Sequence, residues 1–222
     1  MALEDKFLKV VETFSSIQGE STHAGKPCFF IRLAGCNLAC QYCDTEYAQA
    51  EDCGEECSLR TLVDQVLASG IKTVEITGGE PALQANTPLL AQVLLENELE
   101  VLMETNGSVR LDNFPHRLKR IIDVKLPSSG MHEANDPVNY QYLHAGDELK
   151  FVTGSRADFE YALAWIDRWQ LDKKDIPLIF SPVFGAIEPA TLVQLLLENP
   201  RSNMRMQLQM HKFIWPPDQR GV

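Results

Sequence analysis

Apolar and polar positions along the chain follow two alternating periods. Short runs rich in β-branched and other apolar residues predict strands at residues 29–33, 73–76, 100–104, 120–124, 148–152, 177–180 and 205–210. Between these runs, apolar residues recur at helical spacing after residues 58 and 87, from 155 to 169 and after Pro189. This alternation predicts parallel βαβ units in an open sheet or in a full or partial (β/α) barrel, and periodicity alone does not separate the two.

The four predicted helices carry recognisable start and stop signals. Ser58 is expected to cap the first helix and Gly70 to end it, whereas Thr87 is expected to cap the second, with Pro88 at its first position. The side chains expected to face the core are Leu59, Leu62, Val63, Val66 and Leu67 in the first helix, Leu89, Leu90, Val93 and Leu94 in the second, Phe159, Ala162, Ile166 and Trp169 in the third, and Leu192, Leu195 and Leu196 in the fourth.

Composition narrows the class of protein. With 222 residues, 45% of them hydrophobic and 23% charged, the chain is typical of a globular protein, and we expect one domain over residues 1–222. Its net charge of −11 argues against a general nucleic-acid binder or a protein that docks on anionic membranes. An acidic start without an apolar segment predicts a cytoplasmic protein, in which the six cysteines would be metal ligands or free thiols.

Three of those cysteines are close together, after the first predicted strand. Cys36, Cys40 and Cys43 follow the pattern C-x3-C-x2-C. A structural zinc site normally needs four protein ligands, which a distant Cys or His would have to complete. An iron–sulfur cluster held by three thiolates would instead keep one iron open to a substrate or cofactor. On spacing alone the two interpretations are about equally favoured.

Several further motifs resemble those of one enzyme family. The cysteine pattern, with Tyr42 before its last cysteine, resembles the signature of radical S-adenosylmethionine (SAM) enzymes, and Thr77-Gly78-Gly79-Glu80-Pro81 is similar to their glycine motif. Ser16-Ile17-Gln18-Gly19-Glu20, Arg32 before the cluster, Cys43-Asp44-Thr45 and the C-terminal stretch from Gln209 more narrowly resemble the 7-carboxy-7-deazaguanine synthases. The resemblance implies a radical SAM domain with a barrel shortened relative to a complete eight-fold one.

This resemblance implies a set of cofactor contacts. Cys36, Cys40 and Cys43 would hold a 4Fe-4S cluster, and SAM would supply the radical chemistry. The residues expected to contact SAM are Tyr42, Gly78, Gly79, Glu80, Glu104, Thr105, Asn106, Asp123, Val124 and Lys125. Glycines would let the backbone approach SAM closely, although a plain strand-to-helix turn is the alternative. Thr45 corresponds to the position that contacts Mg²⁺ in the family.

The implied reaction converts 6-carboxy-5,6,7,8-tetrahydropterin into 7-carboxy-7-deazaguanine with loss of ammonia. The residues expected to bind this substrate are Ile17, Gln18, Gly19, Glu20, Arg32, Thr77, His211 on the last predicted strand, and Val222. Arg32 is the clearest of them, because a cation inside an apolar run is costly unless it is paired or functional. Its planar guanidinium suits a carboxylate or the edge of a pterin ring.

Other features are assigned less directly. Cys28 is expected to be a small buried hydrophobe, Cys53 and Cys57 free or weakly metal-binding thiols, and Met204, Met206 and Met210 packing residues on one face of the last strand. The resemblance implies a homodimer and a flavodoxin- or ferredoxin-type reductant, for which the basic residues Arg117, Lys119 and Arg120 are a candidate docking patch. The alternatives are another radical SAM enzyme, such as one that generates a glycyl radical, or a zinc-stabilised module without catalysis.

Overall fold

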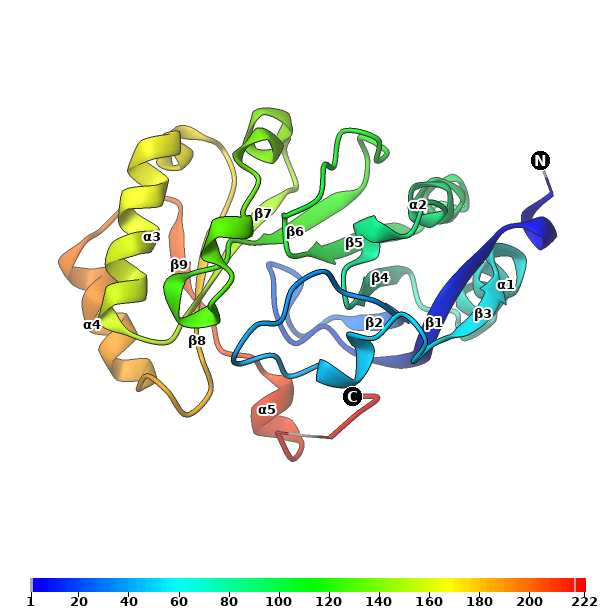
Figure 1. The fold of residues 1–222 in the computed structure, drawn as a ribbon, viewed down its shortest axis with the longest axis horizontal. Helices are drawn as coiled ribbons and strands as arrows, with labels where there is room; N and C mark the ends of the chain where they lie inside the picture. The colour runs from blue at the N-terminus through cyan, green and yellow to red at the C-terminus, as the bar shows by residue number, and fades with distance from the viewer. Residues whose placement is uncertain (1, 218) are drawn as a thin grey trace.

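A computed structural model describes residues 2–217 and 219–222, and within them the strands form one sheet in the order β3-β1-β2-β4-β5-β6-β7-β8-β9 (Figure 1). The strands are β1 (Phe7–Ile17), β2 (Pro27–Leu33), β3 (Glu55–Ser58), β4 (Thr73–Gly78), β5 (Glu100–Thr105), β6 (Lys119–Asp123), β7 (Glu148–Thr153), β8 (Leu178–Pro182) and β9 (Met204–Met206). The α-helices are α1 (Leu59–Ser69), α2 (Thr87–Glu96), α3 (Arg156–Trp169), α4 (Pro189–Glu198) and the short α5 (His211–Ile214).

Strand direction divides the sheet into two parts. From β2 through β4 to β9 every neighbouring pair is parallel, as in Phe29 opposite Val74 and Phe151 opposite Phe180. β1 is antiparallel to both β2 and β3, and it extends the sheet beyond the βαβ units. Because β3 and β9 remain at opposite ends of the sheet, the α/β class and the incomplete barrel expected from the sequence are confirmed.

The helices form where capping and apolar spacing predict them. Ser58 Oγ accepts the Thr61 amide at 3.1 Å, and Gly70 ends α1 in the left-handed conformation, with φ of 71°. The cap of α2 lies one residue earlier than predicted, at Asn86, because the hydroxyl of Thr87 instead donates to Pro81 O at 2.8 Å. Leu67 was expected to face the core but is 45% exposed, so that the buried stripe of α1 is narrower than predicted.

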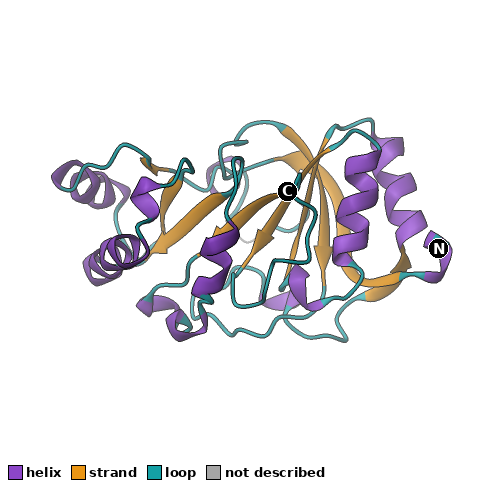
Figure 2. Cartoon of the chain, turned by 90° about the horizontal axis from the view of Figure 1, so that it is seen from above, coloured by secondary structure: helices purple, strands orange, loops and turns teal. Residues whose placement is uncertain are grey.

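The core lies between the sheet and its helices. α1 packs against α2 and α3 against α4, and these two pairs flank the fan of strands (Figure 2). Ile31, Ile76 and Leu102 on successive parallel strands are fully buried, as are Phe151 and Phe180, whose rings stack at 4.9 Å. Parallel strands covered on both faces need such continuous apolar runs, which is why the sequence pattern located them.

Two strands were missed and one was predicted too long. β1 has mixed, half-buried positions, and β3 is a short edge strand, so neither shows a clear apolar period. β9 ends at Met206 rather than at residue 210, because residues 207–210 leave the sheet and lead into α5. The predictions that His211 and Met210 lie on the last strand are therefore wrong: His211 is the first residue of α5 and Met210 precedes it.

The segment after β9 contacts the turn between β1 and β2. Gln207 Nε2 donates to Ser21 O at 2.7 Å, Gln209 Nε2 to Glu20 Oε1 at 2.9 Å, and the Met210 amide to Gly19 O at 3.0 Å. These contacts join the C-terminal segment to the β1–β2 turn, so that they connect β9 to the other side of the incomplete barrel. None of the helices in the described part of the chain is both long and apolar enough to cross a bilayer.

Candidate functional site

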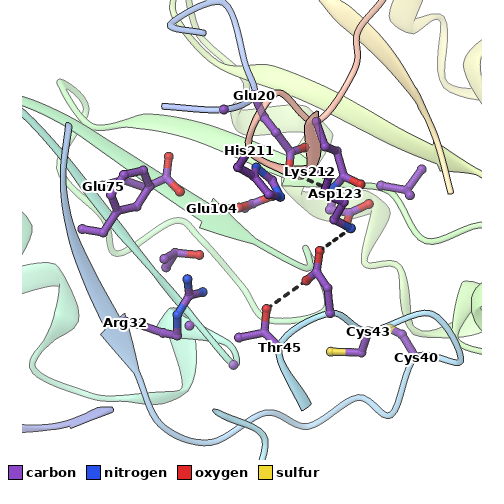
Figure 3. Close-up of a pocket in the computed structure, with 18 of the residues that line it drawn as sticks. Glu20, Arg32, Cys40, Cys43, Thr45, Glu75, Glu104, Asp123, His211 and Lys212 are labelled. Carbon is purple, nitrogen blue, oxygen red and sulfur yellow. Dashed lines mark hydrogen bonds and ion pairs between the residues drawn. The ribbon is translucent and has the colours of Figure 1, made fainter. Parts of the chain in front are cut away.

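A cavity lies at the carboxyl ends of the parallel strands, where α/β proteins bind their ligands (Figure 3). Its walls come from the ends of β1 and β2, the loop between β2 and β3, the ends of β4 to β7, and the C-terminal segment. The predicted site residues that line it are Ile17, Gln18, Gly19, Glu20, Arg32, Cys36, Cys40, Tyr42, Cys43, Thr45, Thr77, Gly78, Gly79, Glu104, Thr105, Asn106, Asp123, Lys125, His211 and Val222.

The three clustered cysteines all face this cavity. Each is a free, half-buried thiol on the loop between β2 and β3. Burial raises the pKa of Cys36 and of Cys40, whereas the ammonium of Lys125 acts in the opposite direction on both. Asn106 Nδ2 donates to Cys36 Sγ at 3.8 Å, so that the end of β5 supports the loop. Three reduced thiols opening on one cavity fit the donor set of an iron–sulfur cluster with one iron left open.

Gly78 and Gly79 have a structural reason to be glycines besides the predicted approach of SAM. A Cβ at Gly78 would collide with the Leu33 backbone, and one at Gly79 with the Gly35 backbone. The Gly79 amide donates to Leu33 O at 3.0 Å, and the Glu80 amide to Gly35 O at 2.8 Å. Close packing of the β4 end against the start of the cysteine loop therefore already requires both glycines, and they still border the cavity.

Glu80 and Val124, both predicted to contact SAM, do not line the cavity. Glu80 is fully buried and accepts from the Ala82 amide at 2.9 Å, the Thr105 hydroxyl at 2.7 Å and the Asn106 amide at 2.6 Å. It thereby joins the ends of β4 and β5 and holds Thr105 and Asn106 at the cavity wall. Val124 is 1% exposed and belongs to the hydrophobic core.

Asp123 and Lys125 form an ion pair at the end of β6. Lys125 Nζ lies 2.7 Å from Asp123 Oδ2. Burial is the largest single effect and lowers the pKa of Lys125, but Asp123, Cys40 and Tyr42 together raise it above its ordinary value, so that its ammonium stays charged. Among the described residues, Asp123 Oδ1 is buried without a hydrogen-bond partner. A buried, unpaired carboxylate oxygen is costly, and a ligand with hydroxyl or amino donors would satisfy it. This fits SAM, which carries both.

A second group of charges lies deeper, between β4, β5 and β7. Lys150 Nζ contacts Glu20 Oε2 at 2.9 Å and also Glu104, and Gln18 Nε2 donates to Glu75 (Figure 3 shows Glu20, Glu75 and Glu104). Burial is the largest single effect and opposes ionisation of Glu20, but Lys150, Gln209 and His211 together outweigh it and lower the pKa of that carboxyl. Burial raises the pKa of Glu104, and it raises that of Glu75 well above the ordinary value, with Glu104 adding to the effect on Glu75.

Arg32 is paired and stacked, as a cation in an apolar strand must be. Its Nε lies 2.8 Å from Glu12 Oε1, and its guanidinium lies over the rings of Phe14 and Tyr47 at 5.7 and 5.8 Å. The two rings and Glu12 restrict the position of the guanidinium, and Arg32 lines the cavity.

The C-terminal segment closes the outer side of the cavity. Lys212 Nζ lies 2.8 Å from Asp44 Oδ2, and the Thr45 hydroxyl donates to Asp44 Oδ1 at 2.9 Å, as the dashed lines in Figure 3 show. Arg220 lies 3.8 Å over the Tyr47 ring. Burial lowers the pKa of His211, which favours its neutral form at neutral pH.

Other predictions about cysteines and basic residues have mixed outcomes. Cys28 is fully buried, as predicted. Cys53 is exposed and Cys57 lies on β3, and both are free thiols. Arg120 cannot belong to a docking patch, because it is 3% exposed and pairs with the buried Asp147. Glu75 and Lys150 were not predicted, although each is a charge inside an apolar run, the signal that identified Arg32.

Comparison with known proteins agrees with this geometry. A family model described as the radical SAM superfamily matches residues 30–171. The 7-carboxy-7-deazaguanine synthase of Chlorobaculum tepidum is 44% identical over 218 residues, 97% of each chain, and that of Clostridium acetobutylicum is 41% identical over 96% of this chain and 99% of its own.

Two solved structures share the fold. The crystal structure of QueE from Escherichia coli, 23% identical, superposes with a TM-score of 0.75 over 92% of this chain and 95% of its own. Streptococcus suis SuiB bound to S-adenosylmethionine, 12% identical, gives a TM-score of 0.54 over 78% of this chain and 48% of its own.

Proposed function

The chain belongs to the radical SAM superfamily and, within it, to the 7-carboxy-7-deazaguanine synthases, and we propose that it converts 6-carboxy-5,6,7,8-tetrahydropterin into 7-carboxy-7-deazaguanine with loss of ammonia. The observation that carries this proposal is the meeting, in one cavity, of the three cysteine thiols with Gln18, Glu20 and Arg32. The thiols account for the superfamily chemistry, and the three polar side chains account for a polar, anionic heterocycle as substrate.

Cys36, Cys40 and Cys43 would hold the 4Fe-4S cluster, and the cluster and SAM together would supply the radical chemistry. The chain's own residues bind and orient. The unpaired Asp123 Oδ1 offers an acceptor to the amino or hydroxyl groups of SAM. Thr105 and Asn106, fixed by Glu80, offer further polar groups beside the cluster loop. Lys125 keeps positive charge near the thiolates.

Substrate recognition is assigned to the deeper half of the cavity. The terminal amino groups of Arg32 provide a planar donor pair for the substrate carboxylate or ring edge. Gln18 and Glu20 provide polar groups toward the ring, and Lys150 holds the carboxylates of Glu20 and Glu104 in place. Ile17, Gly19 and Thr77 complete this wall, while His211 and Val222 approach from the C-terminal segment.

Mg²⁺ is assigned to Thr45. Its hydroxyl lies beside the Asp44 carboxylate, and both are hard oxygen donors of the kind Mg²⁺ prefers, with water and substrate oxygens completing the octahedron. We expect Thr45→Ala to weaken the stimulation of turnover by Mg²⁺, measured as the metal concentration needed for half-maximal rate. An unchanged Mg²⁺ response would remove Thr45 from the metal site.

The remaining assignments concern the whole protein. A single domain over residues 1–222 is supported by the continuous sheet. An electron donor is required by the superfamily chemistry, and a flavodoxin or ferredoxin is our assignment for it. Reduced cysteines and an iron–sulfur cluster support a cytoplasmic location. The homodimer rests on the family resemblance alone, and light scattering of the purified enzyme tests it.

Anaerobic turnover tests the function. The reconstituted protein, given SAM, Mg²⁺, a reductant and 6-carboxy-5,6,7,8-tetrahydropterin, is expected to form 7-carboxy-7-deazaguanine and ammonia in equal amounts. The matched control uses pterin without the 6-carboxylate, which should be a poor substrate. If SAM is cleaved but the carboxypterin gives no product, the protein is a radical SAM enzyme with another substrate. If the protein contains no iron and binds zinc instead, the enzyme assignment is wrong.

A further inference from the structure

The side-chain amide of Gln18 is held at both ends. Its Oε1 accepts the Glu20 amide at 2.9 Å, and its Nε2 donates to Glu75 Oε2. The backbone is held as well, since the Gln18 amide donates to Lys26 O and Gly25 donates to Gln18 O, both at 2.8 Å. Gln18 is 4% exposed and lies on the cavity wall, so that it has no room for alternative conformations.

These partners determine which way the amide faces. An amide can turn over by half a rotation, exchanging its oxygen and nitrogen at little steric cost. A backbone N–H can only donate, so Gln18 Oε1 must face the Glu20 amide, and Nε2 then faces Glu75, whose carboxyl offers it an acceptor oxygen whether or not it is protonated. Each amide atom then keeps one further hydrogen-bonding position, a donor on Nε2 and an acceptor on Oε1.

We propose that Glu75 is a positioning residue that determines substrate specificity: by fixing the Gln18 amide, it makes the cavity wall complementary to a heterocycle with adjacent N–H and C=O groups on one ring edge. This inference rests on the proposed function and deepens it. The lactam of a 4-oxopterin has such an edge, whereas a 4-amino pterin offers a different donor pattern there. No role for Glu75 follows from the cysteine, glycine or Gln-Gly-Glu motifs.

The surroundings of Glu75 favour a neutral carboxyl when the site is empty. Glu75 is 3% exposed on β4, and the charged and titratable groups around it are Glu20 from the β1–β2 turn, Cys28 and Arg32 from β2, Glu104 from β5 and Lys150 from β7. The ammonium of Lys150 pairs with Glu20 and Glu104, and the guanidinium of Arg32 pairs with Glu12. Neither cation therefore forms an ion pair with Glu75, and an anionic substrate would add another negative charge. A protonated Glu75 limits that repulsion, and its carbonyl oxygen still accepts from Gln18.

The test compares two probes, 6-carboxypterin and its 4-amino analogue, by fluorescence titration of the reconstituted enzyme with SAM present. We expect the wild type to prefer the 4-oxo probe by about tenfold or more, the value of one to two buried hydrogen bonds. Glu75→Leu should reduce this preference to about threefold or less, whereas Glu75→Gln, whose amide oxygen also accepts from Gln18, should keep it. Glu56→Gln, on the exposed face of β3, is the matched control.

The pH dependence of 6-carboxypterin binding provides a second measurement. It compares the wild type with Glu75→Gln, so it does not depend on whether Glu75→Leu folds. As pH rises, wild-type affinity for 6-carboxypterin should fall more steeply than that of Glu75→Gln, because only the wild type can gain a negative charge at this position. The probe's own titration is common to both proteins.

The outcomes separate the two proposals. Wild-type preference retained in Glu75→Leu, or identical pH dependence in wild type and Glu75→Gln, would overturn the role of Glu75. A wild type that neither binds 6-carboxypterin nor turns over the tetrahydropterin would instead overturn the proposed function.

Discussion

Six free cysteines offer a direct comparison between the thiols that face the cavity and those that do not. We predict that Cys40→Ala loses the iron and sulfide of the reconstituted protein together with product formation, because a cluster held by only two thiolates is poorly retained. Cluster loss is measured by iron and sulfide assays and by the visible absorption of thiolate-bound iron. Far-UV circular dichroism shows whether the variant is still folded.

Cys53→Ala is the matched control for this experiment. Cys53 is exposed and its Sγ donates to Ala50 O at 2.9 Å, outside the cavity. Its variant should retain wild-type iron content and rate. Full iron content in Cys40→Ala, or equal loss in the two variants, would show that the cluster is not held by the C-x3-C-x2-C motif.

Arg32 permits a separation of substrate binding from SAM chemistry. Arg32→Ala removes a charge-assisted donor pair, and we expect KM for the carboxypterin to rise about tenfold to a hundredfold, while SAM cleavage in the absence of substrate changes by less than about threefold. Arg32→Lys should not restore KM, because an ammonium lacks the planar fork that stacks between Phe14 and Tyr47. Equal losses in both activities would mean that Arg32 supports the fold of the cavity rather than the substrate.

Cysteine spacing, the family resemblance and the rule for buried cations together predicted residues that the structure brings to one cavity. The three thiols and Arg32 were found because a metal cluster needs thiolates and because a cation in an apolar strand needs a partner. Glu80 and Val124 were misplaced, since a motif identifies neighbours in sequence and not the direction in which each side chain points. Glu75 and Lys150 carry the same signal as Arg32, a charge inside a buried strand, and could have been found by applying that rule to every strand.

At the level of elements, the amino ends of the strands are joined by a charge network around Glu100. This residue begins β5 and contacts His23 at 3.0 Å and Lys119 at 2.7 Å, while the Thr73 hydroxyl donates to it at 3.1 Å. Burial opposes its charge, but the bonds from Lys119 and His23 outweigh burial and lower the pKa of Glu100 to about 2. The network therefore links the starts of β4, β5 and β6 to the β1–β2 turn.

The pH dependence of stability follows from the direction of this shift. Because the folded-state pKa of Glu100 is lowered, its contribution is complete above the ordinary carboxyl value of about 4.5 and is lost as pH falls toward about 2. We predict that Glu100→Gln lowers the urea midpoint at neutral pH and that its difference from wild type shrinks below about pH 4. A difference that stays constant down to about pH 3, with Glu56→Gln as control, would exclude this linkage.

Helices and strands were predicted well where burial imposes a regular repeat of apolar positions along the sequence. The parallel strands are covered on both faces and the helices have caps, so apolar runs and Ser or Gly signals located them within a few residues. β1 was missed because its half-buried positions mix polar and apolar residues. β9 was predicted too long because Gln207, Gln209 and Met210 make hydrogen bonds to the β1–β2 turn. Tertiary contacts of this kind leave no local period.

At the level of the whole molecule, the incomplete barrel is closed by hydrogen bonds between the C-terminal segment and the β1–β2 turn rather than by strand pairing. Gly19 and His211 meet where the C-terminal segment reaches the β1–β2 turn, and a Cβ at Gly19 would lie 2.5 Å from His211 Nδ1. Real Cβ atoms do not approach a ring so closely, so a side chain at position 19 must displace His211 from the cavity wall. The closure of the molecule and the geometry of the site therefore depend on the same contact.

We predict that Gly19→Ala raises KM for the carboxypterin and lowers kcat by about as much as His211→Ala does, while the melting temperature falls by only a few degrees, because α5 is short and peripheral. The double variant distinguishes displacement of His211 from a local change in the backbone at position 19. If Gly19→Ala acts through His211, combining the two substitutions costs no more than His211→Ala alone, which is the signature of coupled residues. Losses that add in the double variant would show that the turn and the C-terminal segment shape the cavity independently.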